Sequence, residues 1–96
     1  MVYEGEYLNG ERNGKGKLYD TIEYKIKYEG EFLSGKKNGK GIEYKDSLKY
    51  EGEFKNGKKN GKFKEYIYKK DIDGNYNYIL IFDGEYLNDY RMRGKE

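Results

Sequence analysis

The stretch that decides the fold is residues 3–16, which read YEGEYLNGERNGKG. Residues 28–41 read YEGEFLSGKKNGKG, residues 50–63 read YEGEFKNGKKNGKF, and residues 82–95 read FDGEYLNDYRMRGK, which is a degraded copy. A short unit repeated in this way predicts an array in which each unit packs mainly on its neighbours. A chain of 96 residues is short enough to be one domain. We therefore expect a single repeat domain over residues 1–96, with units starting near residues 3, 28, 50 and 82.

Each unit has a turn signal between two short segments in which polar and apolar residues alternate. The signals are Asn9-Gly10, Ser34-Gly35 and Asn56-Gly57. An Asn-Gly pair favours a two-residue hairpin turn, because that turn requires positive φ at both central positions. Asp20-Thr21, Asp46-Ser47 and Asp73-Gly74 are typical of return turns between units. The sequence therefore predicts an all-β fold: a single-layer antiparallel meander of stacked β-hairpin repeats, elongated and twisted, with roughly seven or eight strands.

The turns also predict which residues share a face of the sheet. Counting outward from Asn9-Gly10 gives the facing pairs Leu8/Glu11, Tyr7/Arg12, Gly5/Gly14 and Glu4/Lys15. Alternation along each strand then gives one face an apolar residue, an aromatic, a glycine and a second aromatic from every unit. These are Met1-Tyr3-Gly5-Tyr7, Ile26-Tyr28-Gly30-Phe32, Leu48-Tyr50-Gly52-Phe54 and Leu80-Phe82-Gly84-Tyr86. The opposite face is predicted to carry the exposed pairs Glu4/Lys15, Glu29/Lys40 and Glu51/Lys62.

Glycine on the aromatic face leaves room for a neighbouring ring to lie over the backbone. Tyr3 over Gly16 and Tyr28 over Gly41 fit this arrangement. We expect the rings to hold the fold, and the charged face to keep the chain in solution and in register.

The composition excludes several function classes. The chain has no Cys and no His, which excludes a disulfide framework and a Ser-His-Asp triad and argues against a zinc or haem site. The formal net charge of +2 gives no general attraction to nucleic acid. The repeated glutamates are interpreted as a solvated face, because a unique active site would not recur in every unit. We expect no catalytic, metal-binding or cofactor-binding residues, and no enzyme activity.

Two short segments have a weak likeness to ligand-binding loops. Residues 35–41 are one residue short of a phosphate-binding loop, and no Ser or Thr follows the lysine. Residues 71–75 are similar to part of a calcium loop, but Leu80 would stand where a bidentate carboxylate is needed. The first segment is therefore interpreted as part of a hairpin, and the second as a turn.

The repeated residues resemble the MORN (membrane occupation and recognition nexus) repeat. Its pattern is close to Y-E-G-E-[WF]-x-N-G-[KR]-x-H-G-x-G, and residues 3–16, 28–41 and 50–63 match it almost throughout. The chain departs from the pattern in three ways: Asn13, Asn38 and Asn60 replace the usual His, Tyr or Phe replaces the usual Trp, and Asp89 replaces a glycine in the fourth copy. The fourth copy is also expected to end before a second strand can pair, as in a short repeat protein or a fragment of a longer array.

The resemblance implies an elongated, twisted sheet of stacked hairpins without catalytic activity. In the family, the module occurs in junctophilins, beside phosphatidylinositol phosphate kinase and lysine methyltransferase domains, and in protozoan cytoskeletal proteins. Its roles there are protein contacts, self-association and proposed binding of acidic phospholipid. The expected function is therefore a non-catalytic interaction and scaffolding module that self-associates. The alternative is peripheral binding to acidic phospholipid membranes. Neither a small-molecule substrate nor a specific nucleic acid is expected.

Two sets of residues are candidates for these interactions. The aromatic face supplies a partner-binding groove made of Tyr3, Tyr7, Tyr28, Phe32, Tyr50, Phe54, Phe82 and Tyr86. The residues after the hairpin turns supply a basic rim made of Arg12, Lys36, Lys37, Lys58, Lys59 and Arg91, opposite an acidic rim of Asp20, Glu23, Asp46, Asp71 and Asp73. The basic rim is interpreted either as a device for solubility and edge protection or as a docking site for acidic head groups or an acidic protein.

Residues 76–82, YNYILIF, break the charge pattern of the array. Ile79 and Ile81 are predicted to fall on the face that elsewhere carries Lys and Glu. That face is then either covered by residues 65–70 or by a partner, or it is an exposed apolar patch. We expect self-association or continuation of an array at this segment. The expected location is the cytoplasm, with peripheral attachment to a membrane or the cytoskeleton as further options.

Overall fold

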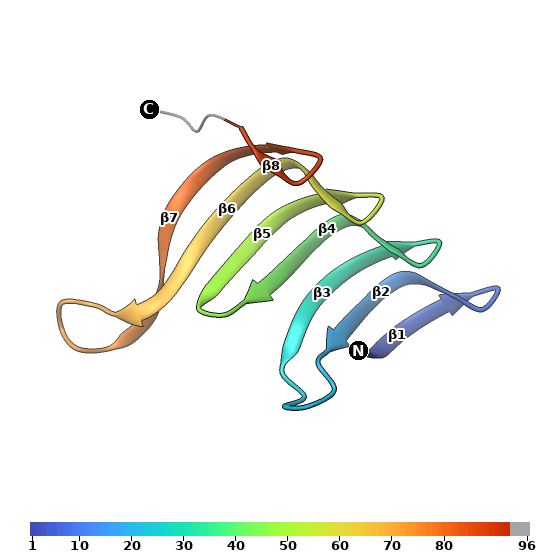
Figure 1. Ribbon diagram of the computed structural model, residues 1–96, viewed down its shortest axis with the longest axis horizontal. Coiled ribbons are helices and arrows are strands. Elements are labelled where there is room, and N and C mark those ends of the chain that lie inside the picture. Colours follow the sequence, from blue (N-terminus) through green and yellow to red (C-terminus); the bar gives the residue numbers. More distant parts are fainter. Residues whose placement is uncertain (93–96) are drawn as a thin grey trace.

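The computed structural model describes residues 1–92 and confirms the predicted all-β meander. The strands are β1 (Val2–Leu8), β2 (Glu11–Tyr19), β3 (Ile26–Leu33), β4 (Lys36–Lys45), β5 (Leu48–Lys55), β6 (Lys58–Lys70), β7 (Tyr76–Leu87) and β8 (Tyr90–Arg91). They form one antiparallel sheet in the order in which they occur in the chain (Figure 1). The principal extents are 49 × 31 × 17 Å, as expected for a single open layer. Within residues 1–92, no helix is long and apolar enough to cross a membrane.

The hairpin turns have the backbone conformation that their sequences predict. The φ values of Asn9 and Gly10 are 51° and 78°, and those of Asn56 and Gly57 are 52° and 84°. The fourth copy forms the same turn with Asn88 and Asp89, at φ values of 48° and 72°. Two residue pairs then join β7 to β8. The prediction that the fourth copy ends before a second strand can pair was therefore wrong, because Asn and Asp tolerate the left-handed conformation.

A bulge in each of the first three hairpins shifts the register beyond the turn. Tyr7 pairs with Arg12 as predicted, but Gly5 pairs with Gly16 instead of Gly14. The extra residues form a loop closed by Glu6, whose Oε1 accepts a hydrogen bond of 2.6 Å from the Lys15 backbone N–H. The predicted pairs Glu4/Lys15, Glu29/Lys40 and Glu51/Lys62 were therefore wrong; the observed pairs are Glu4/Lys17, Glu29/Ile42 and Glu51/Lys64. Because the shift is two residues, each side chain keeps its predicted face.

A row of glycines crosses the sheet in register. It comprises Gly5, Gly16, Gly30, Gly41 and Gly52 on consecutive strands, and Phe63 continues it on β6. The Tyr28 ring covers Gly41, where an added Cβ atom would lie 2.5 Å from two ring carbons. The Tyr28 hydroxyl donates a hydrogen bond of 2.9 Å to the Glu31 carbonyl, which fixes the ring. The predicted arrangement of rings over glycine is confirmed here, and also for Tyr3 over Gly16.

The core is a single file of aromatic rings on this face. The file runs Tyr7, Tyr3, Phe32, Tyr28, Phe54, Phe63, Tyr86 and Phe82, with successive centroids 5.0–6.1 Å apart and edge-to-face geometry throughout. This geometry is the one that ring quadrupoles favour. Tyr28 and Phe32, whose rings are in contact, lie on the same side of the sheet as predicted. Adjacent hairpins are therefore joined by ring contacts as well as by the strand ladder.

Asparagine side chains add a second connection between hairpins. Asn38 Oδ1 accepts a hydrogen bond of 3.1 Å from the Asn56 N–H, and the Gly57 N–H donates to the Lys37 carbonyl at 2.8 Å. The same pair of bonds links Asn13 and Arg12 to Ser34 and Gly35, and Asn60 and Lys59 to Asn88 and Asp89. The asparagines at the usual His position of the resembled pattern thus hold each turn against the preceding hairpin.

The register of β7 departs from the prediction near Ile81. A bulge there pairs Leu80 with Tyr66 and Ile79 with Ile67. Because a one-residue bulge exchanges the faces of all residues beyond it, Leu80 leaves the aromatic face and Ile79 joins it. The predicted faces of Leu80 and Ile79 were therefore wrong, and a similar bulge at Lys27 pairs Ile26 with Tyr19, away from the aromatic face.

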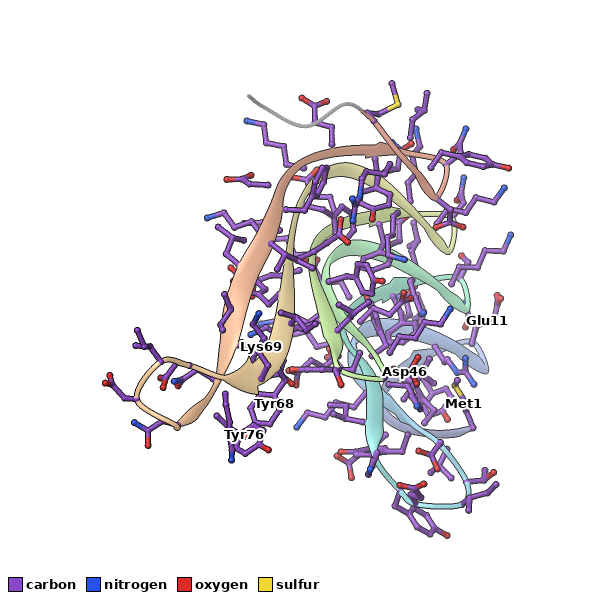
Figure 2. The ribbon with its side chains drawn as sticks, turned by 60° about the vertical axis from the view of Figure 1, so that its left-hand side comes forward. Met1, Glu11, Asp46, Tyr68, Lys69 and Tyr76 are labelled. Carbon is purple, nitrogen blue, oxygen red and sulfur yellow. The ribbon has the colours of Figure 1, made fainter. Side chains whose placement is uncertain are left out.

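The paired ends of β6 and β7 extend beyond their neighbours as a two-stranded arm. Tyr68, Lys69 and Tyr76 mark this arm in Figure 2, far from Glu11 at the hairpin turns. The turn that closes the arm is held by Asp71, whose Oδ1 accepts hydrogen bonds from the N–H groups of Asp73 and Asn75. This contact confirms the interpretation of residues 71–75 as a turn.

Candidate interaction surfaces

The aromatic face lies on the inside of a curved sheet. Lys37 Nζ lies 2.8 Å from Glu43 Oε2, although both residues belong to β4 and are six residues apart. The bulge in this hairpin takes up two of those six residues, because the β3 partners of Lys37 and Glu43, Phe32 and Tyr28, are only four residues apart. The bulge thus brings the two side chains together on the aromatic face of the curved sheet (Figure 1). We call it the concave face, and the opposite side the outer face.

A column of cations lies over the rings of the concave face, one from the start of each second strand. Arg12 lies 5.1 Å from the Tyr3 ring centroid, Lys37 4.9 Å from Tyr28, Lys59 4.4 Å from Tyr50, and Arg91 4.2 Å from Phe82. The side chains of Lys37 and Lys59 are only 24% and 16% exposed. The structure therefore places these two lysines on the concave face and not on the predicted basic rim. Their neighbours Lys36 and Lys58 are exposed, because successive residues of a strand point to opposite faces.

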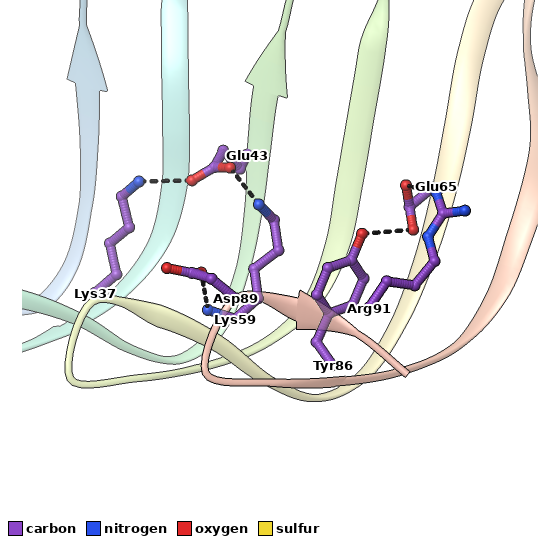
Figure 3. Close-up of polar contacts among 7 residues, drawn as sticks. All are labelled: Lys37, Glu43, Lys59, Glu65, Tyr86, Asp89 and Arg91. Carbon is purple, nitrogen blue, oxygen red and sulfur yellow. Dashed lines mark hydrogen bonds and ion pairs between the residues drawn. The ribbon is translucent and has the colours of Figure 1, made fainter. Parts of the chain in front are cut away.

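Sequence reasoning missed two carboxylates that face this cation column. Glu43 lies between Lys37 at 2.8 Å and Lys59 at 2.9 Å (Figure 3). Glu65 is 1% exposed and accepts hydrogen bonds from the Tyr86 hydroxyl at 2.8 Å and from Arg91 Nη2 at 2.7 Å. Both glutamates stand two residues after the glycine-row positions of their strands, so strict alternation would have placed them on the aromatic face.

The environment of these carboxylates indicates pairing and not acid–base chemistry. Burial by itself would raise the pKa of Glu43, but the bonds from Lys37 and Lys59 outweigh burial and lower its pKa below the ordinary value. A general acid requires the opposite shift. Burial, together with the hydrogen bond to Glu65, raises the pKa of Tyr86 to about 12, so this hydroxyl remains a donor at neutral pH. Within residues 1–92, no group of three acidic side chains is placed to hold a metal ion.

The predicted groove residues do share the concave face, but they differ in exposure. Tyr28, Phe32, Phe54 and Tyr86 are only 0–8% exposed, so they form the core of the chain itself. Tyr3, Tyr50 and Phe82 are half-buried, and Tyr7 is 61% exposed. The file is therefore closed in its middle and open at its β1 end. Contact of the open rings with a partner stays a prediction.

The hairpin turns carry apolar as well as basic side chains. Leu8, Leu33 and Leu87 precede three of the turns and are 58%, 53% and 52% exposed. We define the hairpin rim as these leucines together with the exposed residues Lys36, Lys55 and Lys58. Arg12 is half-buried over Tyr3, and Arg91 is bonded to Glu65, so neither points freely from the rim. The acidic residues Asp20, Glu23, Asp46, Asp71 and Asp73 lie in the return turns at the other end of the strands, as predicted.

The outer face carries two rows of alternating charge. One row runs Glu4, Lys17, Glu29, Ile42, Glu51, Lys64 and Asp83, and the other runs Lys15, Glu31, Lys40, Glu53, Lys62 and Glu85. Between the rows lies an open groove of about 560 Å³, with Gly30, Gly41 and Gly52 in its floor. The charges that pair within each row are opposite in sign, which favours the observed order of strands. Ile42 interrupts the first row, and the hairpin bulges interrupt the register of the second row between Glu31 and Lys40 and between Glu53 and Lys62.

Both ends of the sheet expose strand edges. β1 is the outermost strand at one end, and most of its residues are exposed. At the other end, β8 pairs with Tyr86 and Leu87 of β7. The part of β7 before these residues includes Tyr76, Tyr78, Leu80 and Ile81, which are 43–58% exposed. Unpaired edges with apolar side chains are the usual sites of added strands.

Comparison with known families identifies the repeat unit. The family model described as MORN repeat matches residues 3–21, 28–47 and 50–62. The matched segments together make up more than half of the chain and confirm the resemblance in the first three units. No curated protein sequence matches the chain.

Proposed function

Because the chain belongs to the MORN repeat family, we propose that it is a non-catalytic interaction and scaffolding module that associates with a second copy of itself. The observation that carries this proposal is the open edge of β7. Residues 76–83 have β6 on one side, and no strand among residues 1–92 pairs with them on the other. Exposed backbone N–H and C=O groups beside exposed apolar side chains favour pairing with another chain.

The charge pattern favours β7 over β1 as the self-association edge. Residues 76–82 contain no charged side chain, so two copies of this segment can pair antiparallel without repulsion. Two copies of β1 paired around Gly5 would instead bring Glu4 of each copy opposite Glu6 of the other. Like charges directly opposite each other destabilise a strand pair.

Leu80→Lys is expected to abolish self-association, because symmetric pairing would bring the introduced charges of two copies together. Leu87→Lys is the matched control, since Leu87 is 52% exposed and Leu80 is 49% exposed, but Leu87 lies where β8 already pairs. Light scattering after size exclusion, over a range of concentrations at low and high salt, measures the mass. The wild type and Leu87→Lys should form a dimer that persists at high salt. A monomeric wild type at every concentration, or equal loss in both variants, would contradict the proposal.

A second candidate function is binding to acidic phospholipid surfaces, which the composition of the hairpin rim favours. Exposed leucines at the tips can enter the interface while the neighbouring lysines meet anionic head groups, each lysine contributing about 1 kcal/mol. Lys37 and Lys59 take no part in this candidate, because they are held on the concave face.

Vesicle co-sedimentation tests the lipid candidate. Lys36→Glu/Lys58→Glu is expected to abolish binding to vesicles that contain phosphatidylserine. Neither the wild type nor this variant should bind neutral vesicles. The control Lys17→Glu/Lys64→Glu makes the same change of charge on exposed lysines of the outer face, away from the rim. The candidate fails if both double variants bind equally well, or if the wild type does not sediment with acidic vesicles.

A further inference from the structure

In the third and fourth hairpins the cation of the column pairs with a carboxylate of the strand before, whereas in the second hairpin Leu18 stands opposite Tyr28 and Lys37 pairs with Glu43 of its own strand. Glu43 stands opposite Tyr50 on the following strand, and its Oε1 lies 2.9 Å from Lys59 of that hairpin. Glu65 stands opposite Phe82, and its Oε1 lies 2.7 Å from Arg91 of the fourth hairpin. In both cases a carboxylate opposite the first aromatic of a hairpin pairs with the cation of that hairpin.

Arg12 is the cation of the first hairpin and has no such carboxylate. Its own first aromatic is Tyr3 on β1, and within residues 1–92 no strand lies beyond β1 to supply a residue opposite Tyr3. Arg12 is half-buried over the Tyr3 ring, and no ion pair joins it to a carboxylate of residues 1–92. The position on its own strand that corresponds to Glu43 and Glu65 is Leu18, which is 5% exposed.

We propose that the free edge of β1 binds an extended strand of a protein partner, and that a carboxylate of this strand pairs with Arg12. This goes beyond the proposed self-association, because it uses the opposite edge of the sheet and a different partner. The carboxylate belongs opposite Tyr3 on the concave face. An arginine takes such a group through paired, charge-assisted hydrogen bonds. The main chain of the partner bonds to the unpaired backbone of β1, as in other cases of strand addition.

The outer face of β1 specifies the rest of the partner strand. Glu4 ends one charge row, and Glu6 precedes Lys15, the end of the other. On the interior strands Glu29 meets Lys17, Glu31 meets Lys15 and Glu53 meets Lys40 of the strand before, whereas Glu51 meets Ile42. The partner is therefore expected to carry basic residues two apart, opposite Glu6 and Glu4, followed at once by Glu or Asp. The same two glutamates disfavour phosphate groups, which sets a lipid surface or a nucleic acid apart from this site.

The sequence of β6 satisfies this requirement and supplies a probe. Lys62 pairs with Glu85, Lys64 with Asp83, and Glu65 with Phe82. Glu85, Asp83 and Phe82 correspond in the repeat to Glu6, Glu4 and Tyr3. A labelled peptide with the sequence of residues 61–68, GKFKEYIY, should thus bind along β1, with its glutamate at Arg12.

Fluorescence anisotropy of this peptide with the full chain tests the inference. Arg12→Ala is expected to weaken binding by tenfold or more, whereas Lys36→Ala, which removes the same charge from the exposed rim, should leave it unchanged. A peptide with Gln in place of its Glu should bind the wild type as weakly as the original peptide binds Arg12→Ala. The affinity of the Gln peptide should be the same for the wild type and for Arg12→Ala, because the contact with Arg12 is already absent in that peptide.

A second variant tests the same contact from inside the chain. Leu18→Glu places a carboxylate on β2 where Glu43 stands on β4, so it is expected to occupy Arg12 and to weaken peptide binding by about tenfold. Circular dichroism verifies that both variants remain folded. Peptide binding should persist in Leu80→Lys, and self-association in Arg12→Ala, so failure of one proposal is distinguishable from failure of the other. The inference is overturned if the peptide does not bind, if Arg12→Ala binds it normally, or if phosphate or acidic vesicles displace it competitively.

Discussion

Replacing Phe54 with alanine is expected to lower the free energy of unfolding by about 3–5 kcal/mol. Phe54 is 3% exposed, and its ring lies 5.2 Å from both Tyr28 and Phe63 in the aromatic file. Alanine removes both ring contacts and leaves a cavity that a single layer cannot refill from a second sheet. Small domains have only about 5–15 kcal/mol in total, so the loss should approach global unfolding. Urea denaturation followed by circular dichroism measures it.

Tyr7→Ala is the matched control for this prediction. Tyr7 occupies the same position of the repeat as Phe54, but it is 61% exposed and has Tyr3 as its ring neighbour in the file. Its removal should cost no more than about 1 kcal/mol, which is typical of surface truncation. Equal losses at the two positions would show that the continuous file does not hold the array together.

Gly41→Ala is expected to destabilise the chain by about 3 kcal/mol through overpacking. The added methyl group would lie 2.5 Å from two carbons of the Tyr28 ring. That ring is 0% exposed and is fixed by its hydrogen bond to the Glu31 carbonyl, so it cannot move aside. Thermal or urea unfolding of the variant gives the loss directly.

Gly16→Ala makes the same change one hairpin earlier and serves as the comparison. A methyl group there would also lie 2.5 Å from the ring above it, but that ring belongs to Tyr3, which is half-buried at the open end of the file. The Tyr3 hydroxyl also donates a hydrogen bond, of 2.7 Å, to the Glu6 carbonyl, but the open end of the file leaves this ring room to turn toward solvent once that bond breaks. The loss should therefore be smaller, about 1–2 kcal/mol. If Gly16→Ala proves as costly as Gly41→Ala, freedom of the covering ring is not what decides the cost.

Local sequence predicted the turns, the order of strands and the faces of most residues, because each depends on a residue and its near neighbours. Asn9-Gly10 specifies a turn by its own backbone preferences, and alternation then carries Tyr3 and Tyr7 to one face. The bulge after Arg12 was beyond this reasoning, because it depends on the Glu6 carboxylate bonding to a backbone N–H nine residues away. The same limit applies to Ile81, where one inserted residue exchanges the faces of β7.

The candidate surfaces were harder to predict than the fold. Lys36 and Lys37 are adjacent in sequence and look alike, but alternation along β4 turns only Lys37 toward the rings, where the bulge brings it to Glu43. The bulge depends on contacts between two strands and has no single sequence signal. Glu65 was overlooked because it lies outside the repeated motif, although strict alternation from Phe63 places it on the concave face.

The pairing of every strand with its sequence neighbours has a consequence for how the molecule forms. Contact order is low for such a topology, since no segment must wait for a distant one before its ladder can close. A hairpin completed during synthesis can offer its ring, its asparagine and its strand edge to the next hairpin as that emerges. Strands β6 and β7 are synthesised late and carry the most aggregation-prone residues of the chain. When these strands emerge, the earlier hairpins have already formed and can pair with them at once.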